Sequence, residues 1–223
     1  MTFESKQSQW RPLFRENFES EQHTRSLWGT PTDVSFVGGK GVFDGTAYIN
    51  IDSKLSAVKG TTTGTWSCWI KPVDATPAST NTIIAFWDTS ARGWLIRLWL
   101  EVNGILRAQV FTSWANQWVI ATDAKQFFDN QWTHAVLVHT GSTIILYIDG
   151  VAVAQTITVT VDTTMWFSDV PLIDNGRIGD CNWNAWGEIS HFTWRLNQQR
   201  IYTRALSAAE VMQLYTNQKQ SYE

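Results

Sequence analysis

Short runs of β-branched and aromatic residues recur along the chain from about residue 34 to residue 205, separated by clusters of Gly, Asn, Asp and Thr. This rhythm of short apolar runs and turn-forming residues is typical of antiparallel sheet. We expect strands at 13–18, 34–37, 41–51, 65–71, 81–88, 93–101, 105–112, 117–121, 132–139, 143–149, 151–159, 176–180 and 186–203. The pattern therefore predicts an all-β protein.

Two of these runs carry more specific patterns. In STIILYIDGVAVAQTITV, two β-rich stretches flank Asp149 and Gly150, a pair that tolerates the positive φ angles of a tight type I′ turn. We expect a hairpin there. The run WTHAVLVH is apolar on both of its faces, which indicates a central strand covered on both sides.

One helix is expected, near the end of the sequence. Ser207 and Glu210 form an S-x-x-E capping box. An apolar stripe follows the box, at Val211, Met212, Leu214 and Tyr215. The helix should be short.

The chain is expected to form one domain. No fixed-period repeat, low-complexity tract or linker rich in Pro, Gly or Ser interrupts the 223 residues. A chain of this length can form one β-sandwich with a core of its own. We expect a polar N-terminal arm at 1–12, a sandwich domain at 13–217 and a C-terminal tail at 218–223.

Composition excludes several classes of function. Hydrophobic residues make up 43% and charged residues 17%, as in a folded globular chain. The 17 basic and 20 acidic residues are scattered, so no basic stripe is available for nucleic acid. No apolar run approaches the roughly 20 residues that span a bilayer, and the first residues lack an apolar secretion segment. We therefore expect no nucleic-acid binding, no membrane insertion and no signal peptide.

The two cysteines are too few for a disulfide framework or a metal cluster. Alternation in TWSCWIKP places Cys68 on the same face as Trp66 and Ile70, which favours a small buried core residue. We expect Cys68 and Cys181 to be free, and a bridge between them stays an open alternative.

Four segments identify a family when they are taken in order. They are GVFDGTAYINI at 41–51, TWSCWIKP at 65–72, QWTHAVLVHTGSTIILYIDGVAVA at 131–154 and RIYTRALSAAEVMQLY at 200–215. Together they resemble the concanavalin A-like lectin/glucanase superfamily, in its laminin-G-like or pentraxin-like branch. The resemblance implies a two-sheet antiparallel jelly-roll β-sandwich. It also implies structural roles for Trp132, His134, Asp149 and Gly150.

One departure from this family changes the expected chemistry. Its members often carry an acidic pair, able to bind calcium, before the R-I-Y segment, and here those positions hold Asn197 and Gln198. Neutral amides attract a hard divalent cation less than carboxylates do. Metal-ligand spacing is also missing among the histidines, which are His23, His134, His139 and His191. We expect no cofactor, and structural calcium lacks support in the sequence.

Catalytic patterns are missing as well. Laminarinase-type glycoside hydrolases of this fold arrange carboxylates as E-x-D-x-x-E on one strand face, and neither Glu101 nor Glu188 lies in such a pattern. The Gly38-Gly39 pair in FVGGKGVF fits a strand-to-strand turn. Carboxylates assembled from distant strands stay an open alternative, but we expect that the protein is not an enzyme.

The 14 tryptophans are the unusual feature of the composition. They can fill the core of a wide sandwich or offer exposed platforms on which sugar rings stack. Core filling fits Trp66 or Trp69, Trp87 and Trp132, because each lies in an apolar strand.

A polar and aromatic patch is expected on two consecutive strands. In GWLIRLWLE, every second residue from Leu95 to Glu101 shares a face that we expect to meet solvent. The next strand, ILRAQVFT, adds polar residues to that face if the two strands pair. The candidate ligand-binding residues of this patch are Arg97, Trp99, Arg107 and Gln109.

Four further candidates lie in the Asn-rich connections SWANQW and CNWNAW. They are Trp114, Trp118, Trp183 and Trp186. We expect their rings to be accessible at the rim of the sandwich. Aromatic faces beside amides suit glycan recognition, and Trp is equally enriched at protein interfaces. The expected partner is therefore a glycan or a protein surface.

These features predict a non-catalytic recognition or adhesion protein of the laminin-G-like lectin fold that binds carbohydrate. Display on a virion surface, or release outside the cell by lysis, is one version of this hypothesis. The alternative is a phage virion structural protein, such as a capsid decoration or tail-fibre component, without sugar binding. We expect a homo-oligomer or a larger assembly, and a monomer that binds sugar would favour the lectin hypothesis. A glycoside hydrolase is the third and weakest hypothesis.

Overall fold

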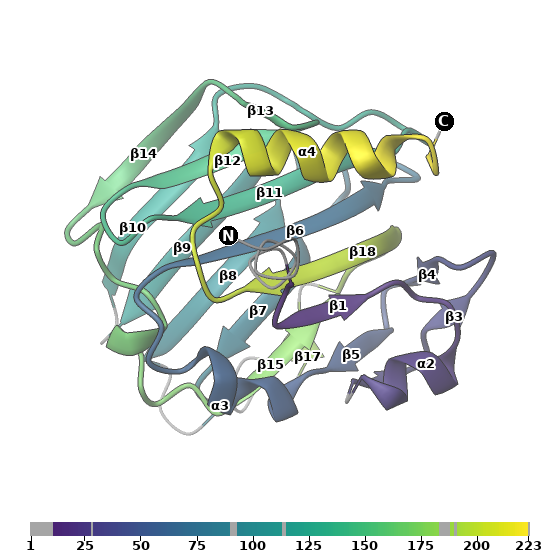
Figure 1. Ribbon diagram of the computed structural model, residues 1–223, viewed down its shortest axis with the longest axis horizontal. Helices are drawn as coiled ribbons and strands as arrows, with labels where there is room; N and C mark the ends of the chain where they lie inside the picture. The colour runs from purple at the N-terminus through teal and green to yellow at the C-terminus, as the bar shows by residue number, and fades with distance from the viewer. Residues whose placement is uncertain are drawn as a thin grey trace, which may run out of the picture.

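The computed structural model describes residues 11–27, 29–89, 93–112, 115–182, 188–189 and 191–222. These residues form two antiparallel eight-stranded sheets that pack as a β-sandwich (Figure 1). The two-sheet jelly-roll prediction is confirmed.

The strands of each sheet come from distant parts of the sequence. In spatial order, the first sheet contains β13 (Val151–Ala152), β12 (Ile144–Ile148), β11 (Thr133–His139), β6 (Gly64–Lys71), β18 (Arg195–Tyr202), β4 (Gly41–Val42) and β3 (Ser35–Phe36), and β1 (Phe14–Glu16) also pairs with β18. The second sheet contains β14 (Gln155–Thr160), β10 (Ala115–Thr122), β9 (Leu106–Thr112), β8 (Trp94–Leu100), β7 (Asn81–Trp87), β15 (Asn175–Ile178), β5 (Tyr48–Asn50) and β2 (Thr30–Thr32).

Smaller elements join these strands. They are the ladder of β16 (Cys181–Asn182) with β17 (Glu188–Ile189), the helices α2 (Glu21–Ser26), α3 (Leu55–Val58) and α4 (Ala208–Lys219), and the 3₁₀ turns η1 (Asp52–Lys54) and η2 (Phe167–Asp169). We did not predict α2, α3 or β2, because such short elements show too little periodicity. In the part of the chain that the structure describes, no helix is long and apolar enough to cross a membrane.

Aromatic rings from both sheets fill the space between them. The ring of Trp66 in β6 lies 5.7 Å from that of Phe86 in β7 of the opposite sheet, and 5.5 Å from that of Trp166. Trp118 in β10 stacks almost parallel to Trp166 at 6.3 Å. All four side chains are buried, so this aromatic layer forms the centre of the core.

Strand β11 is central and covered on both sides, as its sequence predicted. All of its residues are buried. Ala135 and Leu137 face the core between the sheets, whereas Val136 and Val138 pack with residues of α4 in a second apolar cluster. The helix therefore covers part of the outer face of the first sheet (Figure 1).

The capping box predicted at the start of α4 is present. The Oγ of Ser207 accepts a hydrogen bond from the Glu210 N–H, and Oε2 of Glu210 accepts one from the Ser207 N–H. Val211 and Leu214 are buried, but Met212, which we expected in the apolar stripe, is 38% exposed. Met212 lies further round the helix and over the β12–β13 turn instead of over the sheet.

Both predicted tight turns are confirmed. Asp149 and Gly150 have φ angles of 49° and 84°, and Gly38 and Gly39 have φ angles of 58° and 68°. Left-handed angles at both loop positions are those of a type I′ hairpin. Asp149 also fixes the neighbouring strand, because its Oδ1 accepts a hydrogen bond from the His134 N–H at 2.8 Å.

Three predicted strands are divided in the structure. The 41–51 run becomes β4 in the first sheet and β5 in the second, with a turn at Gly45, where φ is 96°. The 151–159 run likewise divides into β13 and β14, which lie in different sheets, and the 186–203 run holds β17 and β18. These predictions were wrong because alternation along a strand looks the same in either sheet.

The end of the chain packs against the first sheet. Helix α4 continues to Lys219, past the expected domain end at 217. Gln218 is 8% exposed, and its Oε1 accepts a hydrogen bond from Trp69 Nε1 at 2.7 Å. Tyr222 stacks on Trp69 with 4.1 Å between the ring centroids. Of the expected arm at 1–12, residues 11–12 are among those described.

Both cysteines are buried, and neither forms a disulfide bond. Cys68 faces the core with Trp66 and Ile70, as alternation predicted. Burial raises the pKa of the Cys68 thiol, because a thiolate is disfavoured without water.

We expect Gly150→Ala to destabilise the fold. A Cβ at this position would lie 3.0 Å from Met212 Sδ and 3.1 Å from Tyr215 Cβ, on a backbone with φ of 84°. The free energy of unfolding, measured by urea denaturation, should fall by about 1–3 kcal/mol. Gly60→Ala is the matched control, because Gly60 has φ of 87° with open space around it. An equal decrease in the free energy of unfolding of the two variants would contradict a steric contribution from α4.

We also expect His134 to make stability depend on pH. Burial, together with the Arg200 charge, lowers the pKa of His134 from 6.5 to about 3. At a pH between these two pKa values, the unfolded state binds more protons than the native state. The free energy of unfolding should therefore fall as pH decreases below 6.5, by at most about 1.4 kcal/mol per pH unit.

The variant His134→Gln isolates this contribution. It should be less stable than the wild type at neutral pH, because it loses packing against Trp69, but its stability should change less on acidification. Urea denaturation at about pH 7 and about pH 5 measures both chains. An unchanged difference between the chains at the two pH values would contradict the prediction.

Candidate functional site

Strands β8 and β9 bring the four residues of the predicted patch together on the outer face of the second sheet. Arg97 lies directly opposite Gln109, and Trp99 lies directly opposite Arg107. The alternate residues of β8 belong to the core; they are Ile96, Leu98 and Leu100. The predicted strand pairing and the division of β8 into two faces are confirmed.

Trp99 is the base on which this patch is built. The guanidinium carbon of Arg97 lies 4.6 Å from the centroid of the Trp99 ring, and that of Arg107 lies 5.7 Å from it. The Nε1 of Trp99 donates a hydrogen bond to Glu101 Oε1 at 3.0 Å, and Arg107 Nη1 donates to the same oxygen at 2.8 Å. Trp99 and Glu101 therefore hold the two guanidinium groups in place.

The face is less open than we expected. Arg97 is 8% exposed and Trp99 is 5% exposed, because the two guanidinium groups and the tryptophan ring cover one another. The prediction of a solvent-facing tryptophan was therefore wrong. Glu101, Arg107 and Gln109 are partly exposed and form the accessible edge of the patch.

Leu95 is also buried, because the outer face carries an apolar cluster of its own. Ala85, Trp87, Leu95 and Cys181 pack together there, with Phe111 against them. Cys181 comes from a distant part of the sequence, so alternation along β8 could not show that it covers this face. The burial of Trp87 agrees with its prediction as a packed residue.

A row of cross-strand partners extends the patch across the sheet. Arg177 of β15 lies opposite Ala85 of β7, Ala85 lies opposite Arg97, and Arg97 lies opposite Gln109. The methyl group of Ala85 thus separates two guanidinium groups. Arg177 Nη1 donates a hydrogen bond to Asp52 Oδ1 at 2.9 Å. We did not predict Arg177 as part of this face, although alternation in the run NGRIGD indicates which side of the strand it lies on.

Arg97 has an unused hydrogen-bond donor at the centre of the patch. Burial lowers the pKa of its guanidinium, whereas nearby Cys181, Glu101 and Asp180 raise it. Its Nη2 lies 3.4 Å from Thr80 Oγ1, and its buried Nε has no hydrogen-bond partner among the described residues. A buried donor without a partner is costly, and a ligand acceptor would remove that cost.

The predicted rim tryptophans have different outcomes. Trp118 is fully buried and its Nε1 donates a hydrogen bond to the Met165 carbonyl at 2.9 Å, so the prediction of an accessible ring was wrong. A shift in the β9–β10 register between Asn116 and Trp118 accompanies this inward orientation. The remaining three lie outside the described residues; they are Trp114, Trp183 and Trp186.

The amides at the positions where family members often carry an acidic pair act as hydrogen-bonding groups in β18. Asn197 Nδ2 donates to the Gly39 carbonyl at 3.0 Å, and Asn197 Oδ1 accepts from the Gln198 N–H at 2.7 Å. Within the described ranges, no group of three or more His, Cys, Asp or Glu side chains is placed to hold a metal ion.

Solved structures with the same fold include carbohydrate-binding and sialidase proteins. The Ruminococcus gnavus IT-sialidase CBM40 bound to α2,3-sialyllactose matches with a TM-score of 0.67 and 11% identity, over 92% of this chain and 100% of that one. The NanB sialidase from Streptococcus pneumoniae matches with a TM-score of 0.64 and 17% identity, over 77% of this chain and 27% of that one.

The leech intramolecular trans-sialidase complexed with 2,7-anhydro-Neu5Ac matches with a TM-score of 0.64 and 14% identity, over 83% of this chain and 27% of that one. This chain therefore corresponds to about a quarter of each of the two sialidase chains, 27% in both cases. At such low identity the likeness is one of fold.

Comparison with curated protein sequences finds no match. The model of one family, described as the concanavalin A-like lectin/glucanases superfamily, matches residues 43–212. This range runs from the core residue Phe43 to the middle of α4, and so includes most strands of both sheets. The chain therefore belongs to the concanavalin A-like lectin/glucanase superfamily.

Proposed function

We propose that this chain is a non-catalytic carbohydrate-binding domain, and that its ligand binds along the accessible edge of the patch formed by Arg97, Trp99, Arg107 and Gln109. The observation that carries this proposal is the pair of guanidinium groups held over Trp99. Their stacking and the shared Glu101 carboxylate leave the donors fixed before any ligand arrives.

The chemistry of this edge suits a sugar that carries a carboxylate. A guanidinium fork matches the two oxygens of a carboxylate, and Arg97 brings an N–H without a partner in the described part of the chain. The Gln109 amide can both donate to and accept from sugar hydroxyl groups. Support for an acidic glycan also comes from the structurally similar CBM40, which is bound to sialyllactose.

Non-catalytic binding is supported by the position of Glu101. Glycoside hydrolysis requires one carboxyl group that donates a proton and a second that acts as base or nucleophile. The Glu101 carboxylate instead accepts hydrogen bonds from Trp99 and Arg107 and so acts as a structural acceptor that positions these two side chains.

Display on a virion surface and assembly into a homo-oligomer stay predictions from the sequence. Light scattering on a sizing column separates the alternatives. A defined oligomer without affinity for any glycan would favour the structural virion protein, and glycan binding by a monomer would favour the carbohydrate-binding domain.

We expect Arg107→Ala to weaken glycan binding about 10- to 100-fold, because a hydrogen bond to a charged group contributes about 1.5–3 kcal/mol. A glycan array first identifies the ligand, with sialyllactose and lactose as an acidic and neutral pair. Isothermal titration calorimetry then compares the variant with the wild type. Arg25→Ala is the matched control, because Arg25 is an exposed arginine paired with Glu21 on α2.

Three outcomes of this experiment have distinct meanings. Weaker binding by Arg107→Ala and unchanged binding by Arg25→Ala would support the proposed patch. Equal binding by Arg107→Ala and the wild type would place the glycan elsewhere. A wild-type chain that binds no glycan on the array would contradict the proposed function.

A further inference from the structure

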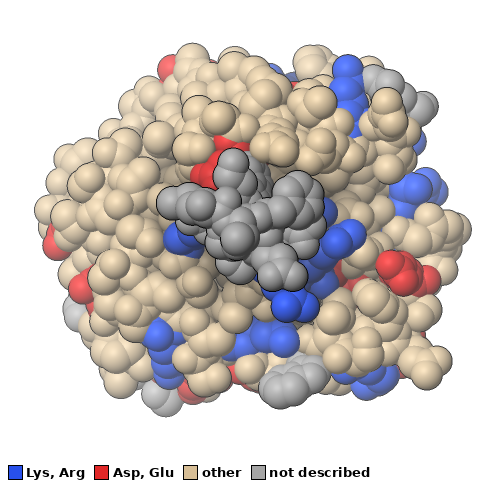
Figure 2. Space-filling view, viewed as in Figure 1, with Lys and Arg blue, Asp and Glu red and all other residues tan. Residues whose placement is uncertain are grey.

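A second polar cluster lies on the outer face of the first sheet, beside the end of α4. In the β1–β18 ladder, Arg15 lies directly opposite Arg200. Both arginines line a cavity of about 330 Å³ between these strands and the helix. Figure 2 shows basic side chains gathered in the middle of this face of the molecule. The fold thus places two guanidinium groups next to each other.

Among the residues that the structure describes, no carboxylate side chain lines this cavity. Besides the two arginines the lining consists of Gln198, Leu214, Asn217, Gln218, Ser221 and Tyr222. Glu16 follows Arg15 in the chain, but it points to the other side of β1, is fully buried and accepts a hydrogen bond from the Phe18 N–H. The C-terminal end of α4 offers only about half an elementary negative charge. The described part of the lining therefore supplies no full negative charge opposite the two positive ones.

Such a pair is unfavourable in a sheet. Like charges directly opposite each other on neighbouring strands destabilise the pairing. Burial lowers the pKa of the Arg200 guanidinium, the Tyr202 side chain raises it, and the charge of Arg15 lowers it further. Because guanidinium groups stay protonated at neutral pH, a bound anion would offset the repulsion between them.

The β-bulge in β18 sets the direction of Arg200. The pairing of β18 with β6 is interrupted between Asn197 and Arg200, and Gln198 adopts a φ angle of 49°. Gln198 Oε1 then accepts a hydrogen bond from Arg200 Nη2 at 2.7 Å. The buried Nε of Arg200 has no hydrogen-bond partner in the described ranges. The bulge therefore fixes one edge of the guanidinium and leaves another donor unused.

Gln218 adds a second unused donor to the same cavity. The indole N–H of Trp69 can only donate, so the oxygen of the Gln218 amide must face it, and the two atoms are 2.7 Å apart. The amide nitrogen is thereby turned to the other side, where it is buried without a hydrogen-bond partner among the described residues. Gln218 is 8% exposed and Tyr222 stacks on Trp69, so this donor is held rigidly.

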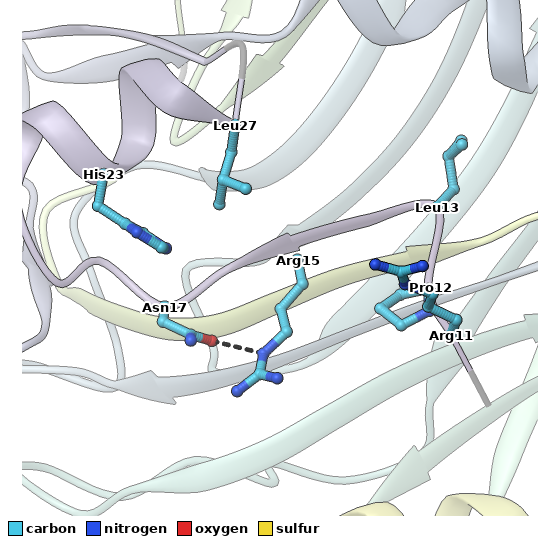
Figure 3. A pocket seen from close by; sticks show the side chains of 7 residues that line it. All are labelled: Arg11, Pro12, Leu13, Arg15, Asn17, His23 and Leu27. Atoms are coloured by element: carbon cyan, nitrogen blue, oxygen red, sulfur yellow. Dashed lines mark hydrogen bonds between the residues drawn. The ribbon is translucent and has the colours of Figure 1, made fainter. Parts of the chain in front are cut away.

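A second cavity of about 390 Å³ shares Arg15 as a wall and carries further basic side chains, Arg11 and His23 (Figure 3). The Nε of Arg15 donates a hydrogen bond to Asn17 Oδ1 at 2.8 Å, and Figure 3 shows the guanidinium turned toward Asn17. This bond orients the guanidinium group of Arg15. Within the described ranges, no residue forms a hydrogen bond with its two terminal nitrogens.

We propose that the cavity between β1, β18 and α4 binds an oxyanion, namely the carboxylate, sulfate or phosphate group of a small molecule. The guanidinium groups of Arg15 and Arg200 and the amide of Gln218 supply its hydrogen-bond donors. The bound anion offsets the repulsion between the two arginines. This site shares no residue with the proposed glycan-binding patch on the second sheet.

Thermal unfolding of the full chain tests this site. Sodium sulfate and sodium phosphate are compared with sodium chloride at equal ionic strength, which separates binding from screening. We expect a saturable rise in Tm with either oxyanion for the wild type. Arg15→Gln and Arg200→Gln should lose this rise, and the matched control Arg25→Gln, an exposed arginine on α2, should keep it.

The variant Arg15→Gln also separates a binding site from a structural pair. Without oxyanions at low salt, its Tm should equal or exceed that of the wild type, because the repulsion is gone. Sulfate stabilises proteins in general, so the difference between variant and wild type is the measured quantity. An equal sulfate response in wild type and Arg15→Gln would overturn the proposal. If Arg200→Gln does not fold, the response of Arg15→Gln alone tests the proposal.

Two organic probes identify the source of the oxyanion. Glucuronate and glucose differ by one carboxylate, and calorimetric titration should detect glucuronate alone if the site accepts an organic acid. A response to sulfate or phosphate without glucuronate would assign the site to inorganic or esterified anions. If glucose and glucuronate give equal responses, and Arg15→Gln gives them too, the proposed oxyanion site is overturned. Arg107→Ala should keep the oxyanion response, which separates this site from the glycan-binding patch.

Discussion

The aromatic layer between the sheets is the constraint on which the rest of the structure depends. Trp166 lies between Trp66 of the first sheet and Trp118 of the second, and His139 stacks on Trp166 at 4.8 Å. Rings of this size help to set the separation of the sheets and fill the space between them. Because the inner faces of both sheets are used in this way, recognition chemistry must lie on the outer faces or at the rim.

The two outer faces are used differently. Helix α4 covers part of the first sheet and leaves a small cavity at its end, where Arg15 and Arg200 meet. In the described part of the chain, no such helix covers β8 and β9 of the second sheet, and the outer side chains there cover one another through the stacking of Arg97 and Arg107 on Trp99. One face therefore offers a half-open pocket, and the other offers a row of donors held by stacking.

Sequence patterns predicted the parts of this arrangement that depend on neighbours along the chain. Alternation separated the two faces of β8, and the Asp149-Gly150 pair predicted the hairpin, because both depend on local backbone geometry. Family resemblance added the two-sheet sandwich itself. The pairing of Arg97 with Gln109 followed once the strands were assumed to be consecutive neighbours.

The remaining features depend on contacts between distant segments, which a single sequence does not show. Trp118 turned inward where a register shift changes the side of the strand that faces the core. Trp99 was covered by arginines on its own strand and on the next, not left open for a sugar. Arg15 and Arg200 lie opposite each other but are far apart in the sequence, so no local pattern could predict their pairing.

The reactivity of the two buried thiols can report where the sandwich opens. Cys68 faces the aromatic layer and Cys181 lies beneath the outer face of the second sheet, so the two sulfurs sit at different depths of the molecule. A thiol that is buried and protonated does not react with alkylating reagents until the structure around it opens. The relative labelling of the two positions would therefore distinguish loosening of the second sheet's outer layer from separation of the two sheets, without any engineered probe.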